Sequence, residues 1–311
     1  MVRNEKKLAD LLGKHNTHRV TILKGDLLVD ADVESLRNQL QNTVDRLDVV
    51  IQLTGGGPLS SNTKFTREIF DLNYRTTFNL VQILERTRKL GSLSLFLYLS
   101  SLAAMGMPSN SEDRILYDER TVCNPILAYE RAKLETEVFL RDFTAAHSFK
   151  TVVLRFPQIY GGHEDAFVGM VRLIRKGVFP IVRGRKGSLP LIHVQDAVNA
   201  IRAVIENMGR IERKYDVNLI SEGSYSYDQL VDVVRNTFGK GGALRLPYSF
   251  LYVAILMVEV AFKVLGKPEP LNRRRLLSLT KDRIVDCNKF VDTFKFKFEQ
   301  NVERFIAGQA T

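Results

Sequence analysis

Apolar residues form two kinds of pattern in this chain, and the two alternate along the sequence. Apolar runs at Leu47–Leu53, Leu95–Leu99 and Thr151–Phe156 are typical of strands buried on both faces of a parallel sheet. Between these runs, apolar residues recur every three to four positions, which is the period of an amphipathic helix. Strands that alternate with helices predict an α/β fold with a doubly wound parallel sheet.

The same patterns predict further elements. A helix is expected from Asn4 to Gly13, and another is expected to begin at Asp32, which we predict as its cap. Asp196 is predicted to cap a later helix. The remaining expected elements are the strands Val20–Leu23 and Tyr215–Leu219 and the helices Thr66–Leu90 and Tyr227–Phe238.

The most hydrophobic stretch is Pro247–Gly266, in which Glu259 is the one acidic residue. With a charge inside it, the stretch is a poor candidate for a membrane-spanning helix. Basic residues flank it, and Arg273-Arg274-Arg275 follows, which suits a helix lying on an anionic membrane. A helix packed over a substrate pocket or at a homodimer seam explains the pattern equally well, so these interpretations stay open.

Composition narrows the class of protein. The 311 residues are 45% hydrophobic and 26% charged, as in ordinary soluble proteins. Two cysteines provide neither a disulfide framework nor metal-ligand spacing, so no metal is expected. The net charge is +10, but the basic residues are spread along the chain and interleaved with 35 acidic residues. This distribution predicts a solvated basic surface and no nucleic-acid partner. The polar opening, Met1–Lys14, predicts a cytoplasmic protein, with membrane association open through residues 247–266.

Candidate chemistry lies in Tyr129 and Lys133, which are four residues apart in a predicted helix. This spacing places a phenol and an ammonium on one helix face. A nearby ammonium favours tyrosinate, so we predict that Lys133 lowers the pKa of Tyr129 and prepares it for general acid–base catalysis. Ser101 follows the strand Leu95–Leu99 and is predicted to present its hydroxyl at the strand's carboxyl end.

Together with four other motifs, these residues resemble the extended short-chain dehydrogenase/reductase superfamily, which contains epimerases, dehydratases and 3β-hydroxysteroid dehydrogenases. The resemblance covers nearly the whole chain and implies a Rossmann-like sheet with a smaller substrate-binding lobe. The motifs, in chain order, are Gly25-Asp26, Asn73-Tyr74-Arg75-Thr76-Thr77, Ser100-Ser101 with Tyr129-x-x-x-Lys133, Arg155-Phe156-Pro157-Gln158-Ile159-Tyr160-Gly161 and His193-Val194-Gln195-Asp196-Ala197.

The resemblance implies four catalytic residues. Tyr129 exchanges a proton with the substrate oxygen, Ser101 fixes that oxygen, and Lys133 tunes Tyr129 and binds the nicotinamide ribose. Asn73 steadies the active-site helix. The implied cofactor is NAD or NADP, bound by Arg3, Asp26, Leu27, Thr54, Gly55, Tyr129, Lys133 and Pro157. An arginine at position 3 suits a 2′-phosphate, which favours NADP.

One family motif is not found. A dinucleotide-binding sheet needs a first strand and a glycine-rich turn that cradles the pyrophosphate, and no G-x-x-G-x-x-G precedes Asp26. Gly55-Gly56-Gly57 follows a later strand and does not replace it. We therefore expect an incomplete dinucleotide-binding domain at 1–160, without the first βα unit, and mainly a substrate-binding lobe at 161–311, with some segments returning to the sheet. Either the chain starts at an internal methionine or it has lost the usual cofactor site, and both predict weak NAD(P) binding.

Two departures from the family pattern bear on the small-molecule substrate. Ser101 is followed by Leu102-Ala103 and not by the Asp-Glu pair of the dehydratases, so dehydration is not the expected reaction. The segment Gly187–His193 contains no arginine to hold a nucleotide diphosphate, although Arg183 or Arg185 could replace it. We therefore predict oxidation of a hydrophobic secondary alcohol, as in 3β-hydroxysteroid dehydrogenases. A nucleotide-sugar 4-epimerase and a non-catalytic scaffold homologue are the alternatives.

Overall fold

The computed structural model describes most of the chain. Arg3 and the helix expected from Asn4 to Gly13 lie outside the described residues. The described residues are 20–56, 62, 65–107, 113–162, 166–269 and 271–309.

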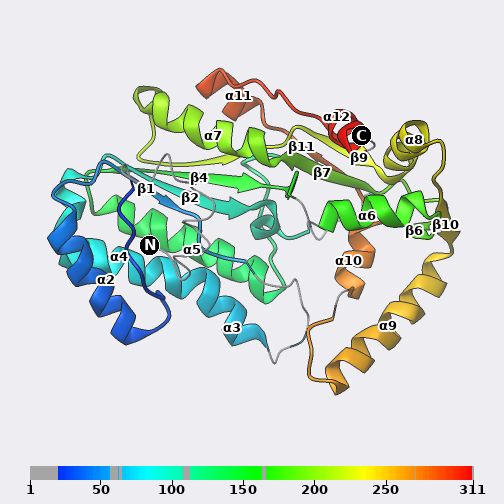
Figure 1. The fold of residues 1–311 in the computed structure, drawn as a ribbon, viewed down its shortest axis with the longest axis horizontal. Helices are drawn as coiled ribbons and strands as arrows, with labels where there is room; N and C mark the ends of the chain where they lie inside the picture. Colours follow the sequence, from blue (N-terminus) through cyan, green and yellow to red (C-terminus); the bar gives the residue numbers. More distant parts are fainter. Residues whose placement is uncertain are drawn as a thin grey trace.

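A four-stranded parallel sheet forms the centre of the fold (Figure 1). Its strand order is β1-β2-β4-β8, and all three neighbouring pairs are parallel, so each pair needs a crossover connection between its strands. In the register of β2 and β4, Ser101 is paired with Phe156. Because all four strands are parallel, their carboxyl ends lie at one edge of the sheet. The strands are β1 (Val49–Gln52), β2 (Leu95–Ser101), β4 (Lys150–Phe156) and β8 (Tyr215–Leu219).

Both faces of this sheet are covered, as successive residues of β2 illustrate. Phe96 and Tyr98 belong to one apolar core, whereas Leu95 and Leu97 belong to the other. The first core lies under α2 (Asp30–Thr43), α4 (Thr76–Arg86) and α5 (Ala128–Ala145), and the second under α7 (Val194–Glu206) and α11 (Asn288–Phe294), on opposite sides in Figure 1. The doubly wound α/β fold predicted from the apolar runs is confirmed.

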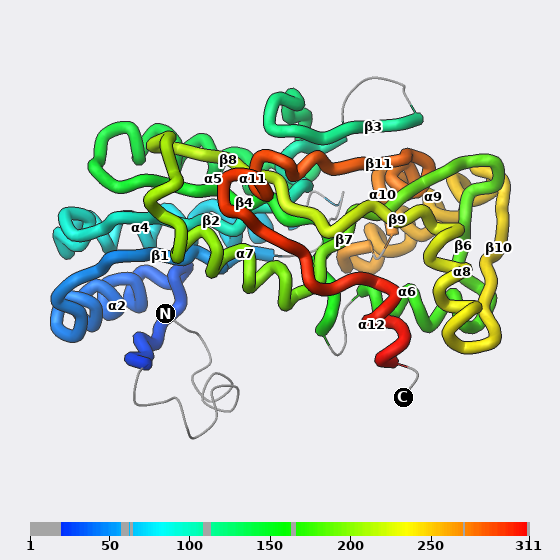
Figure 2. Tube along the Cα trace, turned by 90° about the horizontal axis from the view of Figure 1, so that it is seen from above, coloured from blue at the N-terminus to red at the C-terminus, as the bar shows by residue number. Residues whose placement is uncertain are grey.

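The remaining elements gather beyond one end of the sheet, as Figure 2 shows. They enclose a third apolar core, centred on Phe167, Leu191 and Leu230. Strand β8 and helix α7 belong to the central layers, so later segments do return to the sheet; the division at residue 160 stays a prediction. The elements are β3 (Arg114–Tyr117), β5 (Gln158–Tyr160), α6 (Ala166–Arg175), β6 (Phe179–Val182), β7 (Ser188–His193), β9 (Gly223–Ser226), α8 (Tyr227–Phe238), β10 (Ala243–Leu246), α9 (Tyr248–Val264), α10 (Arg273–Ser278), β11 (Asp282–Val285) and α12 (Val302–Gly308).

The long helix expected at Thr66–Leu90 is interrupted. It consists of α3 (Thr66–Phe70), a π-helical turn at Asp71–Arg75 and α4, and a 3₁₀ turn follows at Lys89–Ser92. A π turn inserts one extra residue into a helix and is frequent at functional sites. Apolar periodicity does not report such an insertion, which explains why the sequence predicted one continuous helix.

Three other local predictions were wrong. Residues Val20–Leu23 form no strand, and within the described part of the chain no strand is paired with them. Helix α2 begins at Asp30, and the Asp32 carboxylate accepts a hydrogen bond from the Asp26 amide at 2.8 Å. Helix α7 is capped by His193, while the buried Asp196 carboxylate accepts hydrogen bonds from the backbone amides of residues 299 and 300.

Candidate active site

The predicted site residues meet at the carboxyl edge of the central sheet. Thr54 follows β1, Ser101 is the last residue of β2, and Pro157 directly follows β4. The register that pairs Ser101 with Phe156 therefore brings Ser101 and Pro157 to the same level. Ligands of open α/β sheets bind outside the carboxyl ends of the strands, so this edge is where a site is expected.

Helix α5 supplies Tyr129 and Lys133 to this edge. The helix starts at Ala128 because the Glu130 carboxylate accepts hydrogen bonds from the amides of Ile126 and Leu127, at 2.8 and 3.2 Å. Tyr129 thus lies in the first turn and Lys133 in the second, on one face as the spacing predicted. Arg274 approaches the same Glu130 carboxylate at 3.5 Å, which joins α10 to the start of α5.

Lys133 is buried, with 4% of its surface exposed. Its Nζ donates a hydrogen bond to the Leu99 carbonyl at 3.0 Å and lies 4.9 Å from the Tyr98 ring centroid and 6.0 Å from that of Tyr129. Burial lowers the pKa of Lys133 to about 8, and the Glu137 carboxylate opposes this effect. Lys133 is therefore mostly charged at neutral pH, and it loses its proton when the pH rises above about 8.

The Tyr129 pKa departs from the sequence prediction. We predicted a lowered value from the neighbouring ammonium, whereas burial raises the pKa of Tyr129 above its ordinary value. A side-chain hydrogen bond from Ser101 acts in the opposite direction, and the Ser101 hydroxyl also accepts the Ala103 amide at 3.1 Å. The Lys133 ammonium is directed at the Leu99 carbonyl, so desolvation dominates. Tyr129 consequently holds its proton at neutral pH.

Asn73 occupies the π-helical turn and is fully buried. Its amide group donates to the Gly56 and Ile69 carbonyls, both at 2.7 Å, and accepts from the Gly56 amide at 2.9 Å. Its own carbonyl accepts a hydrogen bond from Thr136 of α5 at 3.4 Å. Asn73 thus ties the loop after β1 to helix α5, and its role in steadying that helix during catalysis stays a prediction.

The backbone at Gly55 leaves room beside the two most buried polar side chains of the site. A Cβ atom there would lie 2.7 Å from Asn73 Oδ1 and 2.9 Å from Lys133 Nζ, and its φ of +146° disfavours other residues. At Gly56, φ is similar at +144°, but a Cβ would meet nothing within 4 Å. The two glycines therefore share backbone strain and differ in the crowding that a side chain would cause.

We expect Gly55→Ala to destabilise the protein more than Gly56→Ala does. Both variants should lose about 1–3 kcal/mol from the strained backbone. Only Gly55→Ala also pushes a methyl group into Asn73 and Lys133, at a further cost of about 1–3 kcal/mol. Urea unfolding of the two variants measures the difference, and equal losses would show that Lys133 moves aside without cost.

A buried network beside the predicted catalytic residues was not predicted from the sequence. Glu137, one helical turn after Lys133, pairs with Arg155 of β4 at 2.6 Å, and both side chains are less than a tenth exposed. Ser100 donates to the same carboxylate at 2.5 Å. The spacing Tyr129, Lys133, Glu137 was visible in the sequence, but the basic partner of Glu137 lies on a strand that follows this helix. Arg155 was quoted only as part of a motif.

Asp26 and Leu27, predicted to contact adenine, lie in a well-ordered turn. Asp26 Oδ1 accepts the Leu28 amide at 2.9 Å, and the Leu27 carbonyl accepts a hydrogen bond from Asn79 at 2.7 Å. Leu27 itself is buried in the core below α4. Their contact with a cofactor stays a prediction.

The two arginines considered as phosphate ligands are already engaged. Arg185 forms a bidentate pair with Asp113, with both distances 2.9 Å, and Arg183 donates to the Arg245 carbonyl at 3.3 Å. Strand β7, where the family's phosphate-binding arginine was expected, has Leu189 and Pro190 instead. The described residues also contain no group of histidine, cysteine and carboxylate side chains suited to a metal ion.

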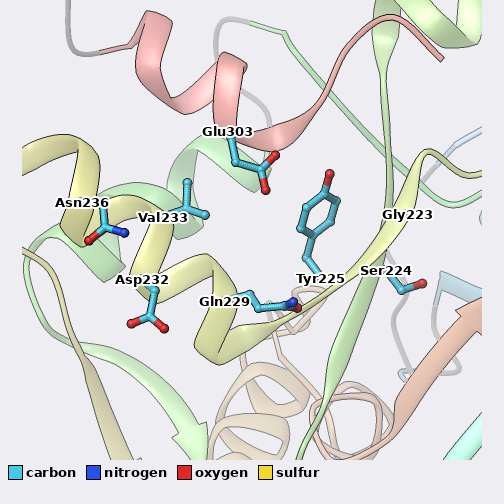
Figure 3. A pocket seen from close by; sticks show the side chains of 8 residues that line it. All are labelled: Gly223, Ser224, Tyr225, Gln229, Asp232, Val233, Asn236 and Glu303. Atoms are coloured by element: carbon cyan, nitrogen blue, oxygen red, sulfur yellow. The ribbon is translucent and has the colours of Figure 1, made fainter.

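A cavity of about 430 Å³ lies elsewhere, between β9, α8 and α12 (Figure 3). Tyr225, Asp232 and Glu303 are among its lining residues, and none of the predicted site residues is. Its two carboxylates would repel a phosphate-bearing cofactor. This cavity is therefore not the catalytic site.

Comparison with known proteins agrees with this geometry. A curated relative, sterol-4-alpha-carboxylate 3-dehydrogenase (decarboxylating) of Dictyostelium discoideum, is 28% identical over 171 residues, or 54% of this chain and 50% of the relative. The chain thus matches about half the length of that relative.

Two solved structures share the fold. The UDP-Glc/GlcNAc 4-epimerase of Campylobacter jejuni has a TM-score of 0.72 at 17% identity, over 99% of this chain and 87% of its own. RMD from Pseudomonas aeruginosa, solved with NADPH, has a TM-score of 0.66 at 18% identity, over 91% and 85%. At these identities the likeness shows the fold alone. The family model of the NAD dependent epimerase/dehydratase family matches residues 3–219. The chain therefore belongs to that family, within the extended short-chain dehydrogenase/reductase superfamily.

Proposed function

We propose that the protein is an NAD(P)-dependent oxidoreductase that acts at a secondary alcohol or ketone. The observation that carries this proposal is the group of Ser101, Tyr129 and Lys133 at the carboxyl edge of the sheet. The Ser101 side chain lowers the pKa of Tyr129 against the stronger effect of burial, and the buried Lys133 ammonium lies 6.0 Å from the centroid of the phenol ring. A scaffold homologue has no physical need for a buried lysine with a lowered pKa.

The residues present fit the nicotinamide end of the cofactor. The bare backbone of Gly55 opens space next to Lys133 Nζ, and Thr54 and Pro157 flank it after β1 and β4. When bound, the nicotinamide accepts or supplies hydride. Lys133 would hold the adjoining ribose. We assign no residue to the pyrophosphate, because the described part of the chain contains no glycine-rich turn leading into a helix.

The chain's own residues manage the proton. For reduction of a ketone, Tyr129 holds a proton at neutral pH because burial raises its pKa, so it can donate to the carbonyl oxygen. For oxidation of an alcohol, the phenolate must accept the hydroxyl proton. Lys133 Nζ lies 6.0 Å from the phenol ring centroid and would stabilise that phenolate while it carries its charge, below a pH of about 8. Ser101 positions the same substrate oxygen.

A hydrophobic alcohol is the substrate class that the surroundings favour. The 3₁₀ turn after Ser101 enters an apolar cluster that includes Leu102, Met105 and Met107. Arg183 and Arg185, the two arginines considered for a diphosphate, are engaged by the Arg245 carbonyl and by Asp113. Helix α9 was a candidate wall of the substrate pocket, but its inner side packs on Val182 and Leu276 and its other side is exposed.

A substrate panel tests the assignment. We expect NAD(P)-linked oxidation of sterol- or terpenoid-like secondary alcohols, with no interconversion of UDP-glucose and UDP-galactose. The cofactor form is decided in the same assay by supplying NAD and NADP separately, for which NADP is our proposal. Clean epimerisation without activity on hydrophobic alcohols would establish the epimerase alternative. Dinucleotide binding in a calorimetric titration, together with inactivity on both substrate classes, would favour a scaffold.

A further inference from the structure

Helix α9 presents an apolar face to the surroundings. Residues spaced alternately three and four positions apart lie along one side of it, and each is more than half exposed: Phe250 (59%), Val253 (54%), Met257 (65%), Val260 (54%) and Val264 (82%). Leu256 and Leu265 widen this face, at 36% and 64% exposure. At about 100° per residue, the apolar face covers roughly half of the helix circumference.

The polar groups of the helix are directed away from this face. Glu259, the only acidic residue of α9, is 12% exposed in its side chain and pairs with Arg273 of α10 at 2.9 Å. It also accepts the Arg273 amide at 2.7 Å. The inner side of the helix is held by Leu251 and Ile255, which are buried against Val182 and Leu276. The charge that breaks the apolar run in the sequence is thus neutralised on the inner side.

Two exposed cations lie at the carboxyl end of the same helix. Lys263 belongs to its last turn, and Lys267 follows shortly after Leu265. Lysines at the border of an apolar face place their ammonium groups among lipid headgroups while their methylene chains stay in the apolar layer. Together with the absence of an unpaired acidic residue on α9, they make the face complementary to a negatively charged surface.

We propose that this face of α9 docks on an anionic lipid bilayer, with the helix lying in the plane of the membrane. A flat, wide apolar face suits a bilayer surface better than the narrow seam of two paired helices. In the part of the chain that the structure describes, no helix is long and apolar enough to cross a membrane. Figure 1 shows α9 at the outer edge of the molecule.

Vesicle sedimentation tests the proposal and requires neither substrate nor cofactor, so it is independent of the catalytic assignment. The full chain should sediment with vesicles of phosphatidylcholine and phosphatidylserine, less so at high salt, and weakly with phosphatidylcholine alone. Met257→Glu should abolish this binding, while Val198→Glu, at a 52% exposed position on α7, should leave it unchanged. Lys263→Glu and Lys267→Glu should each weaken binding to the anionic vesicles by about fivefold or more.

The proposal is overturned if the protein does not bind anionic vesicles, or if Met257→Glu binds as well as the unmodified chain. Light scattering on the same samples identifies the competing occupant. A dimer that Met257→Glu converts to a monomer, without vesicle binding in either form, would show that a second copy covers this face.

Discussion

Replacing Tyr129 by phenylalanine should reduce turnover by about 10²–10⁴-fold, the usual effect of losing a general acid or base. The variant retains the aromatic ring and loses only the phenol oxygen, so its affinity for the cofactor should hardly change. The buried Lys133 and its bond to the Leu99 carbonyl also remain. Steady-state kinetics and cofactor titration of the same preparation separate the two effects.

Tyr248→Phe provides the control, because Tyr248 is 41% exposed at the start of α9 and should retain full turnover. The pH profile adds a second readout. Activity should decline as pH rises past about 8, because Lys133 then loses the charge that stabilises a Tyr129 phenolate. Near-full turnover of Tyr129→Phe would mean that Tyr129 and Lys133 have only a structural role.

Replacing Glu137 by glutamine should lower the free energy of unfolding by about 3–5 kcal/mol, because a buried charge loses its partner. Burial acts to lower the pKa of Arg155, but the Glu137 carboxylate more than reverses this, so the guanidinium stays charged. Without Glu137 that charge would remain buried beside a neutral amide. Urea unfolding measures the loss, and Glu34→Gln in the exposed pair with Arg37 is the matched control that should change stability little.

A further readout distinguishes positioning from simple structural support. The Glu137 carboxylate raises the pKa of Lys133, against the stronger effect of burial. Glu137→Gln should therefore move the Lys133 limb of the pH–rate profile to lower pH in the fraction that remains folded. A stability loss with an unmoved limb would limit Glu137 to holding Arg155. An unchanged stability would mean that the ion pair is not formed in solution.

Much of the fold and of the candidate site could be predicted from local sequence patterns. The dense apolar runs around Leu97 and Val153 predict buried strands, and both are strands in the structure. Helix α8 has the bounds expected from its apolar periodicity. Tyr129 and Lys133 share a helix face, which depends only on their spacing. These features need no knowledge of the rest of the chain.

Features that depend on distant partners could not be predicted. The Val20–Leu23 segment has strand composition but, among the described residues, no neighbouring strand to pair with. The pKa of Tyr129 depends on how deeply the phenol is buried, which no spacing reveals. Arg155 looks like a break in an apolar strand until Glu137 is brought against it. In each case the missing information was a contact across many residues.

The π-helical turn at Asp71–Arg75 changes the direction in which side chains point along the helix that contains it. Each residue rotates a helix by about 100°, so one inserted residue turns everything before it relative to everything after it. Downstream, Leu80 and Leu84 pack in the core against the sheet; within the turn, Asn73 must face the Gly56 backbone. An unbroken α-helix could satisfy only one of these requirements. Deleting a single residue from this turn would thus leave the core intact and direct Asn73 away from the loop it holds.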